Sequence, residues 1–155
     1  MRAPASSGRP HFLFLGLAAA VFASDQLSKL AALAFLPAGS SLPLLDGLLR
    51  LTLTHNTAGA FGFLPGGWPA IAASALISAA IITYCLTGNL VRAPGRALPL
   101  ALITGGALGN LFDRLRTGGV VDFLDLRVWP VFNVADIGIT IGAALLALEL
   151  IRRKA

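Results

Sequence analysis

The sequence has 155 residues, of which 56% are hydrophobic and only 12% charged, whereas about a quarter of the residues in a soluble domain are charged. This balance excludes an ordinary water-soluble domain. The formal net charge of +5 does not indicate a nucleic-acid partner, because the Lys and Arg residues stand singly or at the ends of apolar runs, where they act as topology signals.

The first predicted element is a membrane span over residues 12–36. It is apolar except for polar positions that include Asp25 and Lys29, which are four residues apart and share one helix face, where opposite charges pair away from lipid. The same segment also resembles a secretory signal with a small-residue cleavage pattern ending at Ala23. Because apolar residues resume after Lys29 to the end of the range, we favour one retained span.

The next two elements are a β-element and a second span. Residues 38–65 show short alternation with Gly and Pro punctuation, clearest at residues 49–54, which indicates a small extracytoplasmic β-element. Residues 68–90 form the second predicted span, with Trp68 placed at a membrane interface. Cys85 lies within this span and is the single cysteine of the chain, so it has no disulfide partner and we interpret it as packing.

The third and fourth spans enclose a polar segment. Residues 97–113 form the third predicted span, and Asp113 and Arg114 mark its end. Residues 115–130 mix glycines, charges and a tryptophan over too few apolar residues to span, which indicates an interfacial or partly re-entrant loop. Residues 131–151 form the fourth span.

Basic residues at the ends of the spans predict the orientation. With both termini in the cytoplasm, seven of the twelve Lys and Arg residues lie inside, which favours this topology modestly. All acidic residues except Glu149 then lie toward the outer face. The predicted fold is an all-α membrane protein forming a single integral domain over residues 1–155, with four transmembrane helices, a small extracytoplasmic β-element and an interfacial loop.

Asp122 and Asp136 are the strongest candidates for chemistry, because each lies in an apolar setting at a predicted membrane boundary. Two carboxylates in a partly desolvated pocket share one proton. The charged group then acts as general base on a water molecule, while the protonated group polarises a carbonyl or protonates a leaving amine. The spacing does not establish that they meet, since two aspartates 14 residues apart are a coincidence in most chains.

The other ionisable residues have structural interpretations of equal or greater weight. Asp25 with Lys29 fits an ion pair that holds helices together as well as it fits a function. Asp113 and Arg114 fit an interfacial pair at the end of a span. Asp46 and Asp125 fit solvated loop carboxylates. His55 has no second metal ligand at a usable spacing. No serine or cysteine with a usable histidine is expected at this face, which excludes a nucleophilic triad.

Five stretches, in chain order, resemble the signature blocks of the lipoprotein signal peptidase (signal peptidase II) family. They are residues 25–29 (DQLSK), 56–61 (NTAGAF), 105–114 (GGALGNLFDR), 120–123 (VVDF) and 132–136 (FNVAD). The resemblance implies an aspartyl endopeptidase of the bacterial plasma membrane, with its active site toward the outer face. Its substrates would be diacylglyceryl-modified prolipoproteins, cut just before the lipidated cysteine.

The resemblance also assigns roles to single residues. It makes Asp122 and Asp136 the catalytic pair. Supporting or substrate-binding roles fall to Asp25, Asn56, Asn110, Asp113, Arg114 and Asn133. The expected partners are lipidated prolipoproteins, membrane lipids and the cyclic peptide inhibitor globomycin, and we expect no metal and no cofactor.

Two departures from the family pattern stand out. Ala58 occupies a position where the family has glycine, and Gly59 follows one place later, which predicts a turn shifted by one residue. The stretch between Asp122 and Asp136 is short, which predicts a trimmed loop over the site.

Three glycines in the third span have two interpretations. Gly105, Gly106 and Gly109 thin one helix face, which allows close helix packing or makes room for the transmembrane segment of a substrate. An alternative function is a small nonenzymatic proton-coupled carrier or channel subunit, in which Asp and Arg line a pathway. Such a protein spreads its acids through the membrane depth, whereas here they gather at one boundary.

Overall fold

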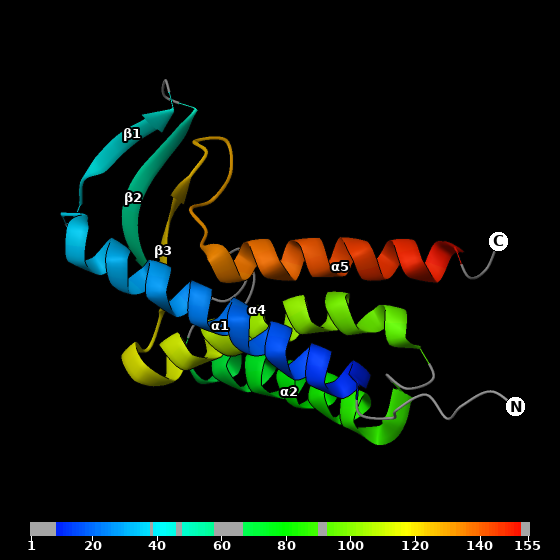
Figure 1. Cartoon of the computed structure of the whole chain (residues 1–155). Coiled ribbons are helices and arrows are strands. Elements are labelled where there is room, and N and C mark those ends of the chain that lie inside the picture. The colour runs from blue at the N-terminus through cyan, green and yellow to red at the C-terminus, as the bar shows by residue number, and fades with distance from the viewer. Residues whose placement is uncertain (1–8, 38, 46–47, 58–66, 90–92, 153–155) are drawn as a thin grey trace, which may run out of the picture.

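The computed structural model describes residues 9–37, 39–45, 48–57, 67–89 and 93–152 (Figure 1). Its elements, in order, are α1 (Arg9–Phe35), β1 (Ser41–Leu45), β2 (Leu49–Asn56), α2 (Trp68–Tyr84), a π-helical turn (Cys85–Asn89), a 3-10 turn (Pro94–Arg96), α4 (Ala97–Thr117), β3 (Val120–Asp125) and α5 (Val134–Arg152). Asp46 and the departure at residues 58 and 59 lie outside the described residues.

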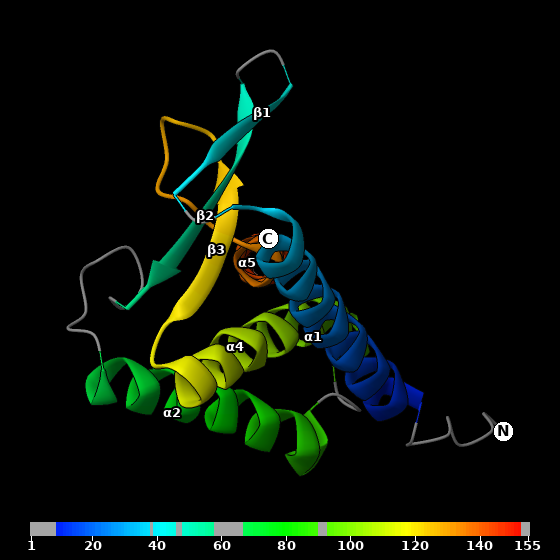
Figure 2. The ribbon, with the colours of Figure 1, turned by 90° about the vertical axis from the view of Figure 1, so that its left-hand side faces the viewer.

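The sheet is antiparallel, in the order β1-β2-β3, and stands at one end of the helices (Figures 1 and 2). Its first two strands confirm the predicted β-element. The third strand, β3, corrects the prediction of an interfacial or re-entrant loop over residues 115–130. The first four residues of β3 are all buried, so the strand lacks the alternation that identifies a half-buried strand in a sequence.

Helix α4 ends later than predicted. It continues to Thr117, a turn beyond Asp113, and stops at Gly118, whose φ of 77° places it in the left-handed conformation typical of a residue that ends a helix. The backbone N–H of Gly118 donates to the carbonyl of Arg114. Because β3 begins two residues later, this stop directs the chain from the helix into the sheet.

Close packing surrounds α4. A Cβ atom added at Gly105 would lie 2.5 Å from the carbonyl oxygen of Ala18 in α1, and one added at Gly106 would collide with the carbonyl of Ala135 in α5. The close-packing interpretation of these glycines is therefore confirmed. Cys85 is fully buried and packs with Phe14 and other core residues, as predicted.

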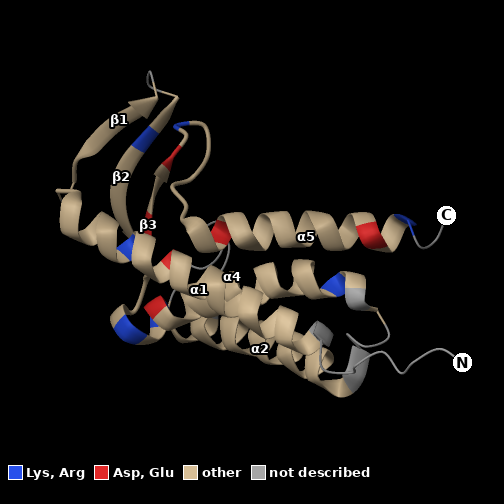
Figure 3. Cartoon of the chain, in the orientation of Figure 1, with Lys and Arg blue, Asp and Glu red and all other residues tan. Residues whose placement is uncertain are grey.

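Two described helices are long and apolar enough to cross a membrane, over His11–Phe35 and Val134–Arg152, and Ile71–Thr87 is a shorter apolar helix. The described residues of α4 do not meet that test; its last turns carry Asp113, Arg114 and Arg116. The structure thus supports a mostly helical protein with a small sheet, and the number of spans stays a prediction. Most of the charged residues in the described chain lie on the sheet and on the parts of the helices nearest to it, and the others lie at the opposite end of the helices (Figure 3).

Candidate active site

Asp122 lies in the buried half of β3. Its side chain is close to the C-terminal end of β2, where Asn56 Nδ2 donates to Asp122 Oδ2 at 3.1 Å. Asn133 Nδ2 donates to the other carboxylate oxygen at 2.6 Å. Burial raises the pKa of Asp122 to about 6, and the negative charge of Asp136 acts in the same direction, against the two amide donors. This carboxyl therefore exchanges its proton near neutral pH.

Asp136 lies in the first turn of α5, where a reciprocal cap fixes it. The backbone N–H of Asp136 donates to Asn133 Oδ1 at 3.0 Å, and the backbone N–H of Asn133 donates to Asp136 Oδ2 at 3.3 Å. This is the geometry of a capping box, with Asn133 before the helix and the acid three residues later. Asn110 Nδ2 from α4 donates to Asp136 Oδ1 at 2.9 Å.

Asn133 joins the two aspartates. It is fully buried, and its side-chain amide donates to Asp122 while its carbonyl oxygen and backbone N–H bond with Asp136. The same Nδ2 lies 3.1 Å from Asn110 Oδ1 and 3.3 Å from the Val121 carbonyl. The structure therefore brings together the two aspartates that the motifs singled out, through one amide residue between them.

A groove of about 540 Å³ opens beside this pair. Its mostly apolar walls come from α2, α4, α5, β3 and the segment between β3 and α5, and its polar lining residues include Asn56, Ser74, Asn110, Arg114, Asp122, Asp136 and Thr140. Arg114 is half-buried, and its Nη1 donates to Ser74 Oγ at 3.3 Å and to the Asn110 carbonyl at 3.4 Å. An apolar groove with a few convergent polar groups is the usual form of a binding site.

The short segment between the aspartates still reaches the site. Phe132 pairs back onto Leu124 through an isolated β-bridge, and Arg127 turns the chain with a φ of 63°. Trp129 and its neighbours through Phe132 line the groove. This segment therefore forms part of the groove wall, and its shortness relative to the family stays a prediction.

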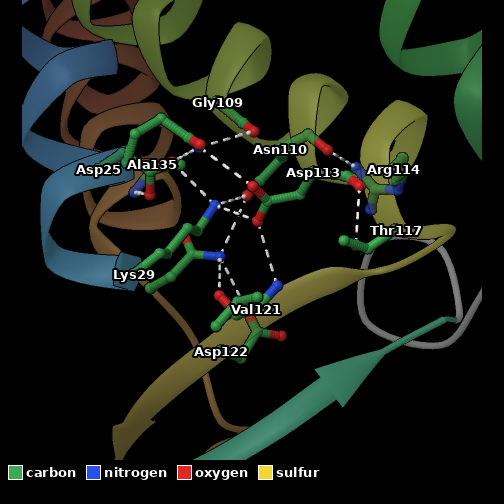
Figure 4. Close-up of polar contacts among 12 residues, drawn as sticks. Asp25, Lys29, Gly109, Asn110, Asp113, Arg114, Thr117, Val121, Asp122 and Ala135 are labelled. Carbon is green, nitrogen blue, oxygen red and sulfur yellow. Dashed lines mark hydrogen bonds and ion pairs between the residues drawn. The ribbon is translucent and has the colours of Figure 1, made fainter. Parts of the chain in front are cut away.

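Behind the pair lies a buried ion cluster (Figure 4). Lys29 Nζ is 2.8 Å from Asp25 Oδ2 and 2.8 Å from Asp113 Oδ2, so the predicted Asp25–Lys29 pair is confirmed and has a second acid. These three residues do not line the groove, unlike Asn56, Asn110 and Arg114. Asp25 and Asp113 are among the site residues that the family resemblance implies, whereas Lys29 is not.

Asp125 and His55, for which the sequence predicts no catalytic role, do not line the groove. Asp125 was interpreted as a solvated carboxylate; it accepts hydrogen bonds from Thr52 Oγ1 at 2.9 Å and from the Arg127 backbone N–H at 2.7 Å, and these donors lower its pKa. His55 Nε2 lies 3.1 Å from Thr117 Oγ1. Within the part of the chain that the structure describes, no three His, Cys, Asp or Glu residues are grouped as metal ligands.

Known proteins resemble this chain over most of its length. The family model described as signal peptidase (SPase) II matches residues 17–152. The lipoprotein signal peptidase of Moorella thermoacetica is 44% identical, over 89% of this chain and 92% of that protein. The corresponding protein of Syntrophus aciditrophicus is 38% identical, over 94% and 96%, and that of Burkholderia mallei is 43% identical, over 96% and 93%.

The fold is similar to solved membrane enzymes. One bacterial membrane enzyme structure, obtained by the in meso method at 2.3 Å resolution, is 28% identical and superposes with a TM-score of 0.80 over 92% of this chain and 89% of its own. A second, at 1.9 Å resolution, is 29% identical with a TM-score of 0.74 over 88% and 91%. On the matched residues and these identities, the chain belongs to the signal peptidase II family.

Proposed function

We propose that this protein is an aspartic endopeptidase that removes the signal peptides of diacylglyceryl-modified bacterial prolipoproteins, cutting just before the lipidated cysteine. One observation carries the proposal beyond family membership: Asn133 hydrogen-bonds both Asp122 and Asp136, and both line the same groove. Two acids held in this way supply the base and the acid that peptide hydrolysis needs.

In this mechanism Asp122 and Asp136 share one proton. The ionised member takes a proton from a water molecule, whose oxygen bonds to the carbonyl carbon before the cysteine, while the protonated member hydrogen-bonds the carbonyl oxygen. The carbon–nitrogen bond then breaks, and a carboxyl proton passes to the leaving amine of the cysteine. Arg114, on the groove wall, would bind a substrate carbonyl, and Asn56 would support Asp122 through its hydrogen bond.

The groove suits a lipidated, helical substrate. Its walls are mainly apolar side chains of α2, α4 and α5, such as Ile77, Ile103 and Ile141, and its polar groups include the two aspartates. A signal peptide segment and its acyl chains are apolar, and the scissile bond is the part that needs the carboxylates. The same chemistry would accept globomycin, which we expect to compete with substrate.

We infer a plasma-membrane topology of four spans, over residues 12–36, 68–90, 97–113 and 131–151, with cytoplasmic termini and an outward-facing site. The start of α1 and the end of α5 lie at the same end of the helices, and the sheet lies at the other (Figure 1). Phe14 and Ala18 belong to the core, which supports a retained first span and not a cleaved signal.

Reporter fusions test this topology. Fusions after Glu149 and within residues 91–96 should report cytoplasm, and a fusion near Asp46 should report the outer side, because basic flanks stay inside. A mature protein clipped after Ala23 would contradict the four-span topology.

Cleavage of a defined precursor tests the function. Purified protein in detergent micelles should cut a precursor carrying a diacylglyceryl cysteine, and mass spectrometry should find that cysteine at the new N-terminus. The control is the same precursor without the lipid, which should be cut far more slowly. No cleavage of the lipidated precursor, together with proton flux in proteoliposomes, would support the carrier alternative instead.

A further inference from the structure

We propose that Lys29 is a positioning residue that sets the separation of the two aspartates by tying together the backbone segments that carry them. The inference rests on the proposed function, since it concerns the geometry of the Asp122–Asp136 pair. It goes beyond that function because Lys29 does not line the groove.

Lys29 is the centre of the buried cluster. Its side chain is 3% exposed, and the partners of its ammonium group are Asp25 and Asp113, each at 2.8 Å, and Asn110 Oδ1 at 3.0 Å. An ammonium group has three N–H donors, so these contacts use all of them. Lys29 lies on α1, and two of its three partners lie on α4, so the cluster joins these helices (Figure 4).

Each acid of the cluster holds the peptide group next to one member of the catalytic pair. Asp25 Oδ1 accepts a hydrogen bond of 2.9 Å from the backbone N–H of Ala135, the residue before Asp136. Asp113 Oδ2 accepts one of 3.1 Å from the backbone N–H of Val121, the residue before Asp122. The start of α5 and the strand β3 are therefore both tied to Lys29 through one carboxylate each.

Two amide side chains complete the cluster. Gln26 Nε2 lies 3.0 Å from Asp25 Oδ2 and 3.1 Å from Asp113 Oδ1, and so links the two acids a second time. Asn110 accepts from Lys29 and from Asn133 with its oxygen, which directs its Nδ2 toward Asp136. Lys29 thus also fixes the orientation of an amide that contacts the pair directly.

The sequence leaves space for this arrangement. A Cβ atom at Gly109 would collide with the Asp25 carboxylate, so glycine at that position lets the acid lie against α4. The cluster of one lysine and two aspartates has a net charge of −1. Backbone N–H donors and buried hydrogen bonds stabilise that charge, as a buried ionic group requires.

Separation and charge affect the catalytic pair differently. Two coupled carboxyls titrate with two apparent pKa values, whose interval grows as the carboxyls approach. Loss of the Lys29 charge alone would shift both pKa values in the same direction and leave the interval between them unchanged. Among the residues that the structure describes, the charged groups around the pair are Lys29 and Asp25 on α1 and Asp113 and Arg114 on α4. A larger separation between the two aspartates would instead reduce the difference between their two apparent pKa values. This reduction would appear as a narrower pH profile of kcat.

A charge-matched double variant separates the two effects. Lys29→Met removes the contacts between the ammonium group and its partners and also removes one positive charge from the cluster. The double variant Lys29→Met with Asp113→Asn removes the same contacts but keeps the net charge of the cluster at −1. We expect kcat on the lipidated precursor to fall on the order of 100-fold in both, the cost of a misplacement of about 1 Å. In both variants the two limbs of the pH profile should lie closer together, with KM little changed.

The control is Glu149→Gln, which breaks the Arg96–Glu149 pair at the other end of the helices and should leave the pH profile unchanged.

If the double variant regains the wild-type kcat and the wild-type distance between the two limbs of the pH profile, Lys29 acts by charge alone and the proposal is wrong. It is equally wrong if the variants lose thermal stability but keep the wild-type profile per folded enzyme. If Lys29→Met does not fold, kcat and the pH profile of the double variant decide between the two effects. If neither variant folds, the same two quantities are measured in Asp25→Asn, where a wild-type kcat and pH profile would overturn the proposal. A wild-type protein that does not cleave overturns the proposed function itself.

Discussion

The two ends of strand β3 carry the same residue type in opposite environments. At the inner end Asp122 is 2% exposed, faces Asn56 and Asn133, and has a pKa raised to about 6 by burial. At the outer end Asp125 receives hydrogen bonds from Thr52 and from the Arg127 backbone, and its pKa is lowered. Three residues along one strand thus separate a candidate proton carrier from an ordinary surface acid.

This difference teaches what the fold adds to a sequence motif. Both acids accept two hydrogen bonds, so hydrogen bonding does not distinguish them. What differs is the removal of water and the nearby charge of Asp136, which both favour the protonated form of Asp122. Asp122 is therefore suited to proton transfer, whereas Asp125 stabilises the pairing of β3 with β2.

Among the residues that surround the two aspartates, the largest effect should come from Asn133→Ala, which removes the amide between them. The variant loses the 2.6 Å bond to Asp122 and the cap on the backbone N–H of Asp136, so both carboxyls lose their positions. We expect kcat to fall on the order of 100-fold or more and stability by about 1 kcal/mol, the usual cost of a lost helix cap. A kcat near that of the wild type would contradict the importance of the inner end.

A smaller effect is expected for Asn56→Ala, which removes one donor, the 3.1 Å bond to Asp122 Oδ2. Because that donor favours the ionised carboxyl, its loss should raise the pKa of Asp122 above 6. The limb of the pH profile that reports this group should move to higher pH, with kcat lowered roughly 10-fold at neutral pH. A profile that stays in place would show that Asn56 binds substrate and does not tune Asp122.

The two ends should also differ in how stability depends on pH. The folded pKa of Asp122 is raised from 3.8 to about 6, so the folded state binds the proton more tightly and gains stability as pH falls through this window. Asp125 has a lowered pKa, so its contribution is lost as pH falls. Between pH 7 and 4, melting curves should show a weaker gain in stability on acidification in Asp122→Asn than in wild type, and below about pH 4 they should show a smaller loss of stability in Asp125→Asn. Identical slopes in the two variants would remove the contrast.

The smallest effect is expected for Thr52→Val at the outer end. It removes the 2.9 Å hydrogen bond to Asp125, which is partly exposed to solvent, and the 2.6 Å hydrogen bond between Thr52 Oγ1 and Ser41 Oγ. Stability should fall only slightly, because solvent screens an interaction with a surface carboxylate, and cleavage of the lipidated precursor should be unchanged. A marked loss of cleavage would mean that the outer end takes part in substrate binding.

Local signals in the sequence were sufficient for part of this account. Long apolar runs predicted α1 and α5, alternation predicted β1 and β2, and the pair Asp25 with Lys29 followed from helical spacing. The motifs identified both aspartates. Asn133 followed by Asp136 also has the spacing of a capping box, which could have predicted their contact.

Contacts between distant segments could not be predicted in this way. Strand β3 is six residues long and mostly buried, and its partner β2 lies more than 60 residues earlier, so neither alternation nor a nearby turn reveals it. The second acid on Lys29, Asp113, comes from another helix. Only the folded chain shows that one lysine connects to the segments that carry Asp122 and Asp136.

The central claim is that Asp122 and Asp136 together perform the cleavage, and one measurement tests it most directly. Single-turnover cleavage of a diacylglyceryl-modified precursor should be compared in purified wild type, Asp122→Asn, Asp136→Asn and, as the matched control on the same strand, Asp125→Asn. Asparagine keeps the size of the side chain but cannot act as the base, so the first two variants should lose cleavage by at least about 1,000-fold while staying folded, and Asp125→Asn should cleave as wild type does. Cleavage at a rate comparable to wild type by folded Asp122→Asn or Asp136→Asn would contradict the two-aspartate mechanism.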